Sequence, residues 1–115
     1  MSAEFICDFD DLVPAKAKLV RRDERLIAFY RIGASVYAVD AVCPHWNGPL
    51  ARGQVSVERL EVICPWHRFR YSLVDGRCVA ARDKRPRLRT YPVKIDEGRV
   101  YADLTSELQQ ETAAG

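Results

Sequence analysis

Two short segments contain the side chains of this sequence that are best suited to hold a metal. One is Cys43-Pro44-His45, and the other is Cys64-Pro65-Trp66-His67. The chain has two histidines in all, and each of them follows a cysteine within one of these segments. Two thiolates and two imidazoles can hold a single Zn²⁺ ion, or a two-iron cluster with both imidazoles on one iron. The candidate metal ligands are Cys43, His45, Cys64 and His67.

The way these ligands are divided between the two segments favours the cluster over zinc. A zinc site usually takes both cysteines from one pair and both histidines from another. Here each segment contributes one cysteine and one histidine, as a cluster with split ligation requires. Eighteen residues lie between His45 and Cys64, enough for the chain to run through a β-hairpin and return. We therefore expect a [2Fe-2S] cluster, and a zinc-stabilised β interaction module is the alternative of a different class.

Strand signals separated by turns fill most of the chain and must position these two segments. Residues 24–32 and 35–42 are rich in β-branched and aromatic side chains and flank Gly33, which predicts a hairpin. Asp75-Gly76 is the strongest short turn signal, and Pro92 indicates an edge position or a bulge. Further strands are expected over residues 55–57, 60–63, 69–74, 77–80, 89–95 and 99–103. Strands at this spacing predict an all-β, antiparallel sandwich or small barrel, with both ligand segments in loops.

Length and composition indicate one small globular domain. The chain has 115 residues, of which 48% are hydrophobic and 30% charged, so it can bury one core. We expect a single domain over residues 1–105, with the metal-binding portion at about 41–75, and a C-terminal tail at 106–115. Apolar runs stay well below the roughly 18 residues of a membrane span, and residues 1–8 do not resemble a secretory signal. The sequence predicts a soluble, cytoplasmic monomer that does not bind membranes.

Two further features have no partner motif. Cys7 and Cys78 lack a histidine at short spacing, so we expect buried thiols in strands rather than ligands or disulfides. Residues 82–89 are strongly basic, which indicates a solvated face or a docking face for an acidic protein; no nucleic-acid motif accompanies them, so we expect no nucleic-acid partner. The basic residues of this segment are Arg82, Lys84, Arg85, Arg87 and Arg89.

Taken together, the two segments resemble the cluster-binding loops of the Rieske-type ferredoxins. Residues 43–50 and 64–67 carry the resemblance, and the flanking sequence is similar over roughly residues 26–104. It implies a Rieske-like antiparallel β-fold, with a cluster-binding subdomain formed by two loops and a hairpin. In that family two cysteines hold the inner iron, here Cys43 and Cys64, and two histidines hold the outer iron through Nδ1, here His45 and His67. Residues 84–87 correspond in position to a proline-containing loop that covers the cluster.

The resemblance also implies a function. It is that of a one-electron carrier, the ferredoxin component that connects a flavin-containing NAD(P)H reductase with a terminal (di)oxygenase. The chain has no third histidine for a mononuclear iron and no glycine-rich dinucleotide motif, so we expect an electron-transfer component and no catalytic residues of its own. The alternative within the family is the small subunit of an NADH-dependent nitrite reductase.

Differences from the respiratory members of the family indicate the redox potential. Those members have an additional cysteine in each loop, where this chain has Gly48 and Trp66. They also have a serine two residues after the second histidine, where this chain has Phe69, although Tyr71 keeps their tyrosine. Hydrogen bonds to the cluster or thiolate sulfur stabilise the reduced state, so losing one predicts a low-potential centre. Trp46 and Trp66 are expected mainly to shield the cluster from water.

Overall fold

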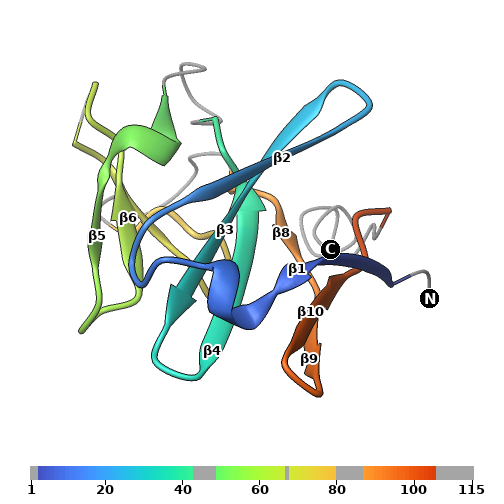
Figure 1. The fold of residues 1–115 in the computed structure, drawn as a ribbon. Helices are drawn as coiled ribbons and strands as arrows, with labels where there is room; N and C mark the ends of the chain where they lie inside the picture. Colours follow the sequence, from blue (N-terminus) through green and yellow to red (C-terminus); the bar gives the residue numbers. More distant parts are fainter. Residues whose placement is uncertain (1–2, 43–48, 67, 80–86, 106–115) are drawn as a thin grey trace.

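The computed structural model describes residues 3–42, 49–66, 68–79 and 87–105 of the chain (Figure 1). In this part of the chain the strands form three small antiparallel sheets, connected by turns and two short 3₁₀ helices. This confirms the predicted all-β, antiparallel class. No helix within these residues is long and apolar enough to cross a membrane.

The first two sheets form the body of the molecule. One has the order β1-β10-β9, with β1 at Glu4–Asp8, β10 at Arg99–Ala102 and β9 at Val93–Asp96. The other has the order β2-β3-β4-β8, with β2 at Lys18–Arg22, β3 at Arg25–Ile32, β4 at Ser35–Asp40 and β8 at Thr90–Tyr91. A 3₁₀ helix, η1 at Phe9–Asp11, follows β1.

The third sheet belongs to the predicted metal-binding portion. Its order is β5-β6-β7, with β5 at Gln54–Ser56, β6 at Glu61–Ile63 and β7 at Arg70–Ser72. A second 3₁₀ helix, η2 at Leu50–Arg52, leads into β5. Val55 lies opposite Val62, and Val62 lies opposite Tyr71. The predicted hairpin between the two ligand segments is therefore present, with a third strand added by the chain that follows the second segment.

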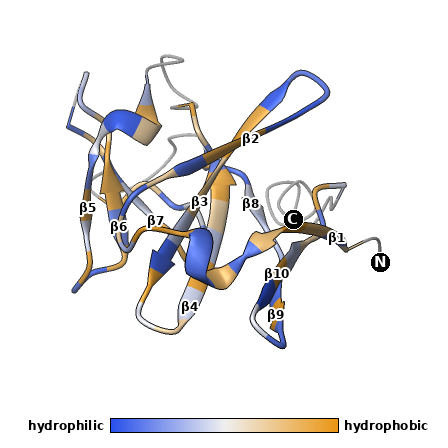
Figure 2. Ribbon diagram, viewed as in Figure 1, coloured by the Kyte–Doolittle hydropathy of each residue, from blue (hydrophilic) through white to orange (hydrophobic). Residues whose placement is uncertain are grey.

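Strand β3 lies between two hydrophobic cores. Ile27 to Tyr30 are buried in succession, as expected for a strand covered on both faces. Because side chains alternate along a strand, Ala28 and Tyr30 face the core that contains the third sheet. Ile27 and Phe29 face the core formed with β1 and β10. Figure 2 shows hydrophobic residues along β3 and β4 and hydrophilic ones at the β2–β3 and β9–β10 turns.

The predicted strands at 77–80 and 89–95 differ from the structure. The described residues of the first form an isolated antiparallel bridge between Cys78 and Tyr71 and no named strand. The Ser72 amide donates to the Arg77 carbonyl there, and the Val79 amide donates to the Arg70 carbonyl. The second is interrupted at Pro92, so β8 joins one sheet and β9 another. Strand β2 was not predicted, because it is an exposed edge strand with three basic residues and little apolar alternation.

The two cysteines outside the ligand segments are buried, as predicted. Cys7 is 6% exposed in β1 and Cys78 is 4% exposed after the Asp75-Gly76 turn. Burial raises the pKa of the Cys7 thiol, so the protonated, less reactive form is favoured there. Both cysteines therefore act as small packing residues in the core.

Tyr30 has a buried hydroxyl without a hydrogen-bond partner among the described residues. The residue is 1% exposed, and burial raises its pKa to about 12. An unpaired buried hydroxyl costs about 1–3 kcal/mol. A raised pKa in the folded state also means that stability is lost as the pH rises from about 10, the ordinary tyrosine value, towards 12.

We expect Tyr30→Phe to raise the free energy of unfolding by about 1 kcal/mol at pH 8, because it removes the unpaired hydroxyl. The variant should also lose less stability than the wild type between pH 10 and about 12. Urea unfolding followed by circular dichroism at both ends of the range measures this. Tyr37→Phe, at a partly exposed position on β4, is the control. A Tyr30→Phe variant less stable than the wild type at pH 8 would contradict the assignment.

Candidate metal centre

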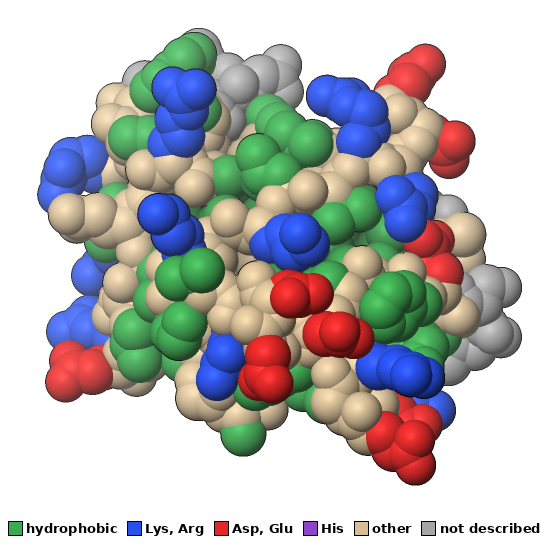
Figure 3. All heavy atoms as spheres, in the orientation of Figure 1, with side chains coloured by type: hydrophobic (Ala, Val, Ile, Leu, Met, Phe, Trp, Pro, Cys, Tyr) green, Lys and Arg blue, Asp and Glu red, His purple; other side chains and the backbone are tan. Residues whose placement is uncertain are grey.

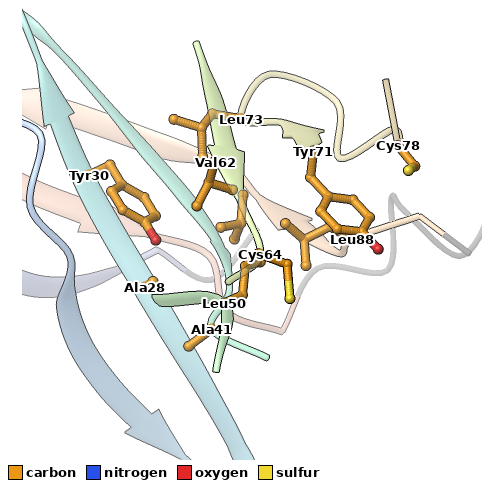
Figure 4. Close-up of a cluster of buried hydrophobic side chains, with 11 residues drawn as sticks. Ala28, Tyr30, Ala41, Leu50, Val62, Cys64, Tyr71, Leu73, Cys78 and Leu88 are labelled. Carbon is orange, nitrogen blue, oxygen red and sulfur yellow. The ribbon is translucent and has the colours of Figure 1, made fainter. Parts of the chain in front are cut away.

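Cys64 is the predicted ligand whose position the structure gives. It directly follows β6, its side chain is fully buried, and it belongs to the core cluster drawn in Figure 4. Leu50, Tyr71 and Leu88 are members of the same cluster, and each of them is at most 1% exposed. Cys43, His45 and His67 lie outside the described residues. Among the residues that are described, no three His, Cys, Asp or Glu side chains lie close enough together to hold a metal ion.

The second ligand segment has a closed, hydrogen-bonded stem. The Cys64 amide donates to the Phe69 carbonyl at 2.8 Å, and the Arg68 amide donates to the Cys64 carbonyl at 2.7 Å. Arg68 has a φ of +60°, a conformation typical of tight turns. The described residues on both sides of the turn between β6 and β7 are therefore held together by main-chain hydrogen bonds, and the Cys64 side chain is buried beside them.

The two ends of the first ligand segment meet beside the same core. The Ala51 amide of η2 donates to the Ala41 carbonyl at 3.1 Å, and the Ala41 amide donates to the Leu26 carbonyl of β3 at 2.9 Å. The neighbouring Leu50 is fully buried in the cluster that contains Cys64. The chain thus leaves and returns at one place, next to Cys64, which is the arrangement that two ligand loops require.

A third segment reaches this core from the other side. Leu88 is 1% exposed, and its amide donates to the Gly76 carbonyl at 2.8 Å. Gly76 has a φ of +78°, and a Cβ there would lie 1.9 Å from the Leu88 carbonyl oxygen. Only glycine therefore allows this approach. The sequence reasoning identified Gly76 as a turn residue, but it gave no signal for its contact with Leu88.

The described surroundings of Cys64 fit a cluster with two thiolate and two imidazole ligands. A lone thiolate in an apolar core would be strongly disfavoured. Two ferric ions, two sulfides and two thiolates sum to zero charge, whereas four thiolates would leave a charge of −2. The apolar residues around Cys64 therefore suit the neutral oxidised cluster, and this charge balance also favours a higher potential than four cysteines would give.

The residues that follow Cys64 differ from one another in exposure. Trp66 is 59% exposed, and its expected role as a shield stays a prediction; Trp46 lies outside the described residues. Phe69 packs against the core cluster, at the position where a hydroxyl donor was considered. The Arg70 Nε lies 3.9 Å from Glu61 Oε1, a loose pairing for a carboxylate only 7% exposed. Tyr71, by contrast, is fully buried.

Gly53, the residue that follows η2, allows the chain to lie directly against β6, the strand that precedes Cys64. A Cβ at this position would lie 1.7 Å from the Ile63 carbonyl oxygen, a contact that requires the backbone to move. Gly53 lies within the stretch of roughly residues 26–104 that is similar to the family, but no sequence signal indicates this contact. The glycine therefore sets the distance between the return of the first ligand segment and the start of the second.

We expect Gly53→Ala to lower the free energy of unfolding by at least about 2 kcal/mol, because the backbone must shift to admit the methyl group. Gly33→Ala is the matched control: its Cβ meets nothing within 4 Å, and its φ of +63° leaves only local strain, of about 1–2 kcal/mol. Chemical denaturation of both variants measures the difference. We also expect Gly53→Ala, but not Gly33→Ala, to lower the iron content of the purified protein. Equal losses of stability in the two variants would contradict the close approach.

Comparison with known proteins shows extensive similarity. Residues 4–103 match the family described as the Rieske-like [2Fe-2S] domain. The ferredoxin subunit of 3-phenylpropionate/cinnamic acid dioxygenase from Photorhabdus laumondii is 30% identical over 109 residues, covering 93% of this chain and 99% of that protein. The ferredoxin component of the naphthalene 1,2-dioxygenase system of Pseudomonas putida is 33% identical over 79 residues, covering 69% of this chain and 73% of that protein.

Solved structures show the same fold. The ferredoxin of carbazole 1,9a-dioxygenase from Nocardioides aromaticivorans IC177 superposes with a TM-score of 0.77 at 25% identity, covering 89% of this chain and 97% of that one. A protein from Mycobacterium tuberculosis, described as a candidate small subunit of an NADH-dependent nitrite reductase, gives a TM-score of 0.76 at 29% identity. The superposition covers 88% of this chain and 93% of the Mycobacterium tuberculosis chain.

Proposed function

Because the chain belongs to the family of Rieske-like [2Fe-2S] domains, we propose that it is a ferredoxin that carries one electron from a flavin-containing NAD(P)H reductase to a terminal oxygenase. The observation that carries this proposal is the 30% identity with a dioxygenase ferredoxin subunit over nearly the full length of both chains. Its relatives are electron-transfer components, so the chain is a carrier and not a catalyst. The cofactor is one [2Fe-2S] cluster of the Rieske type.

The ligands that we propose are the four predicted from the sequence. Cys43 and Cys64 hold the inner iron, and His45 and His67 hold the outer one. The full burial of Cys64 supports its place on the inner side, and the meeting of Ala41 with Ala51 supports a first ligand loop beside it. When bound, the cluster accepts and releases a single electron. Around Cys64 the protein contributes an apolar environment of buried side chains.

The surface near the ligand segments suits a protein partner with acidic groups. Trp66 is exposed, and Arg68, Arg77 and Arg87 are exposed as well. Exposed tryptophan is enriched at the energetic centres of interfaces, and surrounding cations accelerate encounters with an acidic surface. In the face shown in Figure 3, basic side chains dominate the half with β5 and η2, whereas acidic ones gather over η1 and the β9–β10 hairpin. We infer that partners dock at the Trp66 end.

Three further parts of the proposal concern the setting of the domain. We propose that the domain extends over residues 1–105, with its cluster-binding portion at about 41–75 and a tail at 106–115. We also propose that it works as a monomer in the cytoplasm, the compartment in which thiols such as Cys7 and Cys78 stay reduced.

A nitrite reductase small subunit is the second candidate function. The 29% identity with the Mycobacterium tuberculosis protein favours it. A ferredoxin is expected to purify alone as a stable monomer, whereas a subunit of a larger enzyme is expected to require its partner. Gel filtration of the isolated chain, followed by reduction with a ferredoxin reductase, separates the two functions.

We expect Cys64→Ser to abolish most of the visible absorbance of the purified protein, because it removes a thiolate ligand of the inner iron. His45→Cys should retain cluster but lower its potential, because a third thiolate adds negative charge. Absorption, iron content and the EPR spectrum of the reduced protein measure these effects. Cys7→Ser and Cys78→Ser, at buried positions outside the ligand set, are the controls. Full cluster content in Cys64→Ser, or an unchanged potential in His45→Cys, would contradict the assignment.

We also propose a low-potential centre, in the lower half of the roughly −150 to +300 mV range of Rieske centres. Phe69→Ser restores a hydroxyl near the cluster. If that hydroxyl stabilises the reduced state by about 1 kcal/mol, the potential rises by roughly 40 mV. Spectroelectrochemical titration measures both variants, with Phe69→Ala as the control that opens the same space without a donor. Equal potentials for Ser and Ala would contradict the role given to position 69.

A further inference from the structure

A partly buried network connects three strands close to the first ligand segment. The Tyr91 hydroxyl donates to Asp40 Oδ1 at 2.6 Å. The Arg25 Nη1 donates to the Tyr91 hydroxyl at 3.4 Å, and its guanidinium lies 5.5 Å from the centre of the Tyr91 ring. The Arg25 Nη2 donates to the Leu104 carbonyl at 2.6 Å. The network thus joins the start of β3 and the ends of β4 and β8 to the main chain at Leu104.

The strand register brings these side chains to one face of the sheet. Ile27 lies opposite Asp40, and Ala38 lies opposite Tyr91. Arg25 and Ile27 are two residues apart on β3, as Ala38 and Asp40 are on β4, so all four point to the same side. Tyr91 and Asp40 are therefore diagonal cross-strand neighbours, within reach of a long aromatic side chain.

Asp40 stands where several segments around Cys64 begin or end. Its amide donates to the Arg89 carbonyl at 3.0 Å, which fixes the end of the basic segment. The next residue, Ala41, is bonded to both Leu26 of β3 and Ala51 of η2. Cys43 follows Asp40 by three positions in the sequence. The carboxylate of Asp40 is thus held at the root from which the first ligand segment departs.

The partial burial of Asp40 and Tyr91 opposes ionisation of both groups. Burial raises the pKa of Asp40, and the hydrogen bond from Tyr91 and the charges of Arg89 and Arg25 only partly offset this. Burial, and next the hydrogen bond to Asp40, likewise raise the pKa of Tyr91. A half-buried carboxylate contributes little net stability, because its desolvation opposes the hydrogen bonds it makes. What such a group does provide is a defined position.

We propose that Arg25, Tyr91 and Asp40 form a positioning network that fixes the root of the first ligand segment and thereby retains the cluster. This inference rests on the proposed ligand role of Cys43 and His45. The side chains do not touch the cluster in this proposal; they act through the main chain of Asp40 and Ala41.

The chain contains a matched arrangement that serves as a control. Arg31, at the other end of β3, also lies over an aromatic ring, at 4.2 Å from the centre of Phe9. It also donates to a main-chain carbonyl, that of Leu12, at 3.1 Å. Arg31 therefore has the same kinds of interaction as Arg25 on the same strand, but its partners lie in the segment after β1 and not at the root of a ligand segment.

The test measures the rate of cluster loss in cluster-loaded protein, with an iron chelator and at a temperature where all variants remain folded by circular dichroism. We expect Tyr91→Phe and Asp40→Ala to lose the visible absorbance about fivefold faster than the wild type, the factor for one lost hydrogen bond. Asp40→Asn keeps the acceptor oxygen and should stay within about twofold of the wild-type rate. Arg31→Gln should lower the melting temperature without accelerating cluster loss. The g-values in the EPR spectrum of the reduced protein should shift in Tyr91→Phe and stay unchanged in Arg31→Gln.

Two results would overturn the inference. One is a Tyr91→Phe protein with the wild-type rate of loss and wild-type g-values. The other is an Arg31→Gln protein that loses its cluster as fast as Tyr91→Phe, because the rate would then follow global stability. Failure of the proposed function looks different: the wild-type protein itself would contain no iron, and the inference would fall with it.

Discussion

The fold depends on one strand that must be covered on both faces. Four consecutive residues of β3, from Ile27 to Tyr30, are at most 1% exposed. Such a strand is stable only if two separate apolar layers pack on it, because each face removes its own area from water. One layer comes from the strands at the two ends of the chain. The other comes from the third sheet and η2, the part that contains Cys64. The predicted metal-binding portion thus provides one of the two apolar layers that cover β3.

Main-chain contacts bring the three segments near Cys64 to their places. Ala41 bonds to Ala51, Gly76 bonds to Leu88, and the Cys64 carbonyl closes its own turn. Backbone groups are obligatory donors and acceptors when buried, so such contacts fix geometry with little dependence on the side chains present. Side-chain identity matters where a methyl group would collide, as at Gly53, or where an aromatic ring reaches across strands, as at Tyr91. This division explains why most of the surrounding positions can be simple apolar residues.

The sequence was sufficient for the features that depend on local pattern. The β3–β4 hairpin, the pair of strands between the ligand segments and the burial of Cys7 and Cys78 follow from alternation, turn residues and side-chain size. The four ligands stay a prediction, because Cys43, His45 and His67 lie outside the described residues. Features that depend on distant partners could not: the pairing of Gly76 with Leu88, the close approach of Gly53 to Ile63, and the exposure of Trp66. Nothing within a short window distinguishes a glycine in a turn from one pressed against a carbonyl twelve residues away.

The pairing of β4 with β8 has a consequence for how such a domain varies. Val39 lies opposite Thr90, and the Asp40 amide bonds to Arg89, so the chain leaves the second sheet and re-enters it at neighbouring points. The segment between these two points, which includes the third sheet, is topologically an insertion into the second sheet. The second sheet, here called the host, holds the two ends of this insertion together. A change in the number of residues inside the insertion therefore does not alter the register of the host strands. A replacement of the insertion must still supply the apolar layer that covers one face of β3, so the redox properties can be retuned in the ligand loops while that layer and the host sheet stay the same.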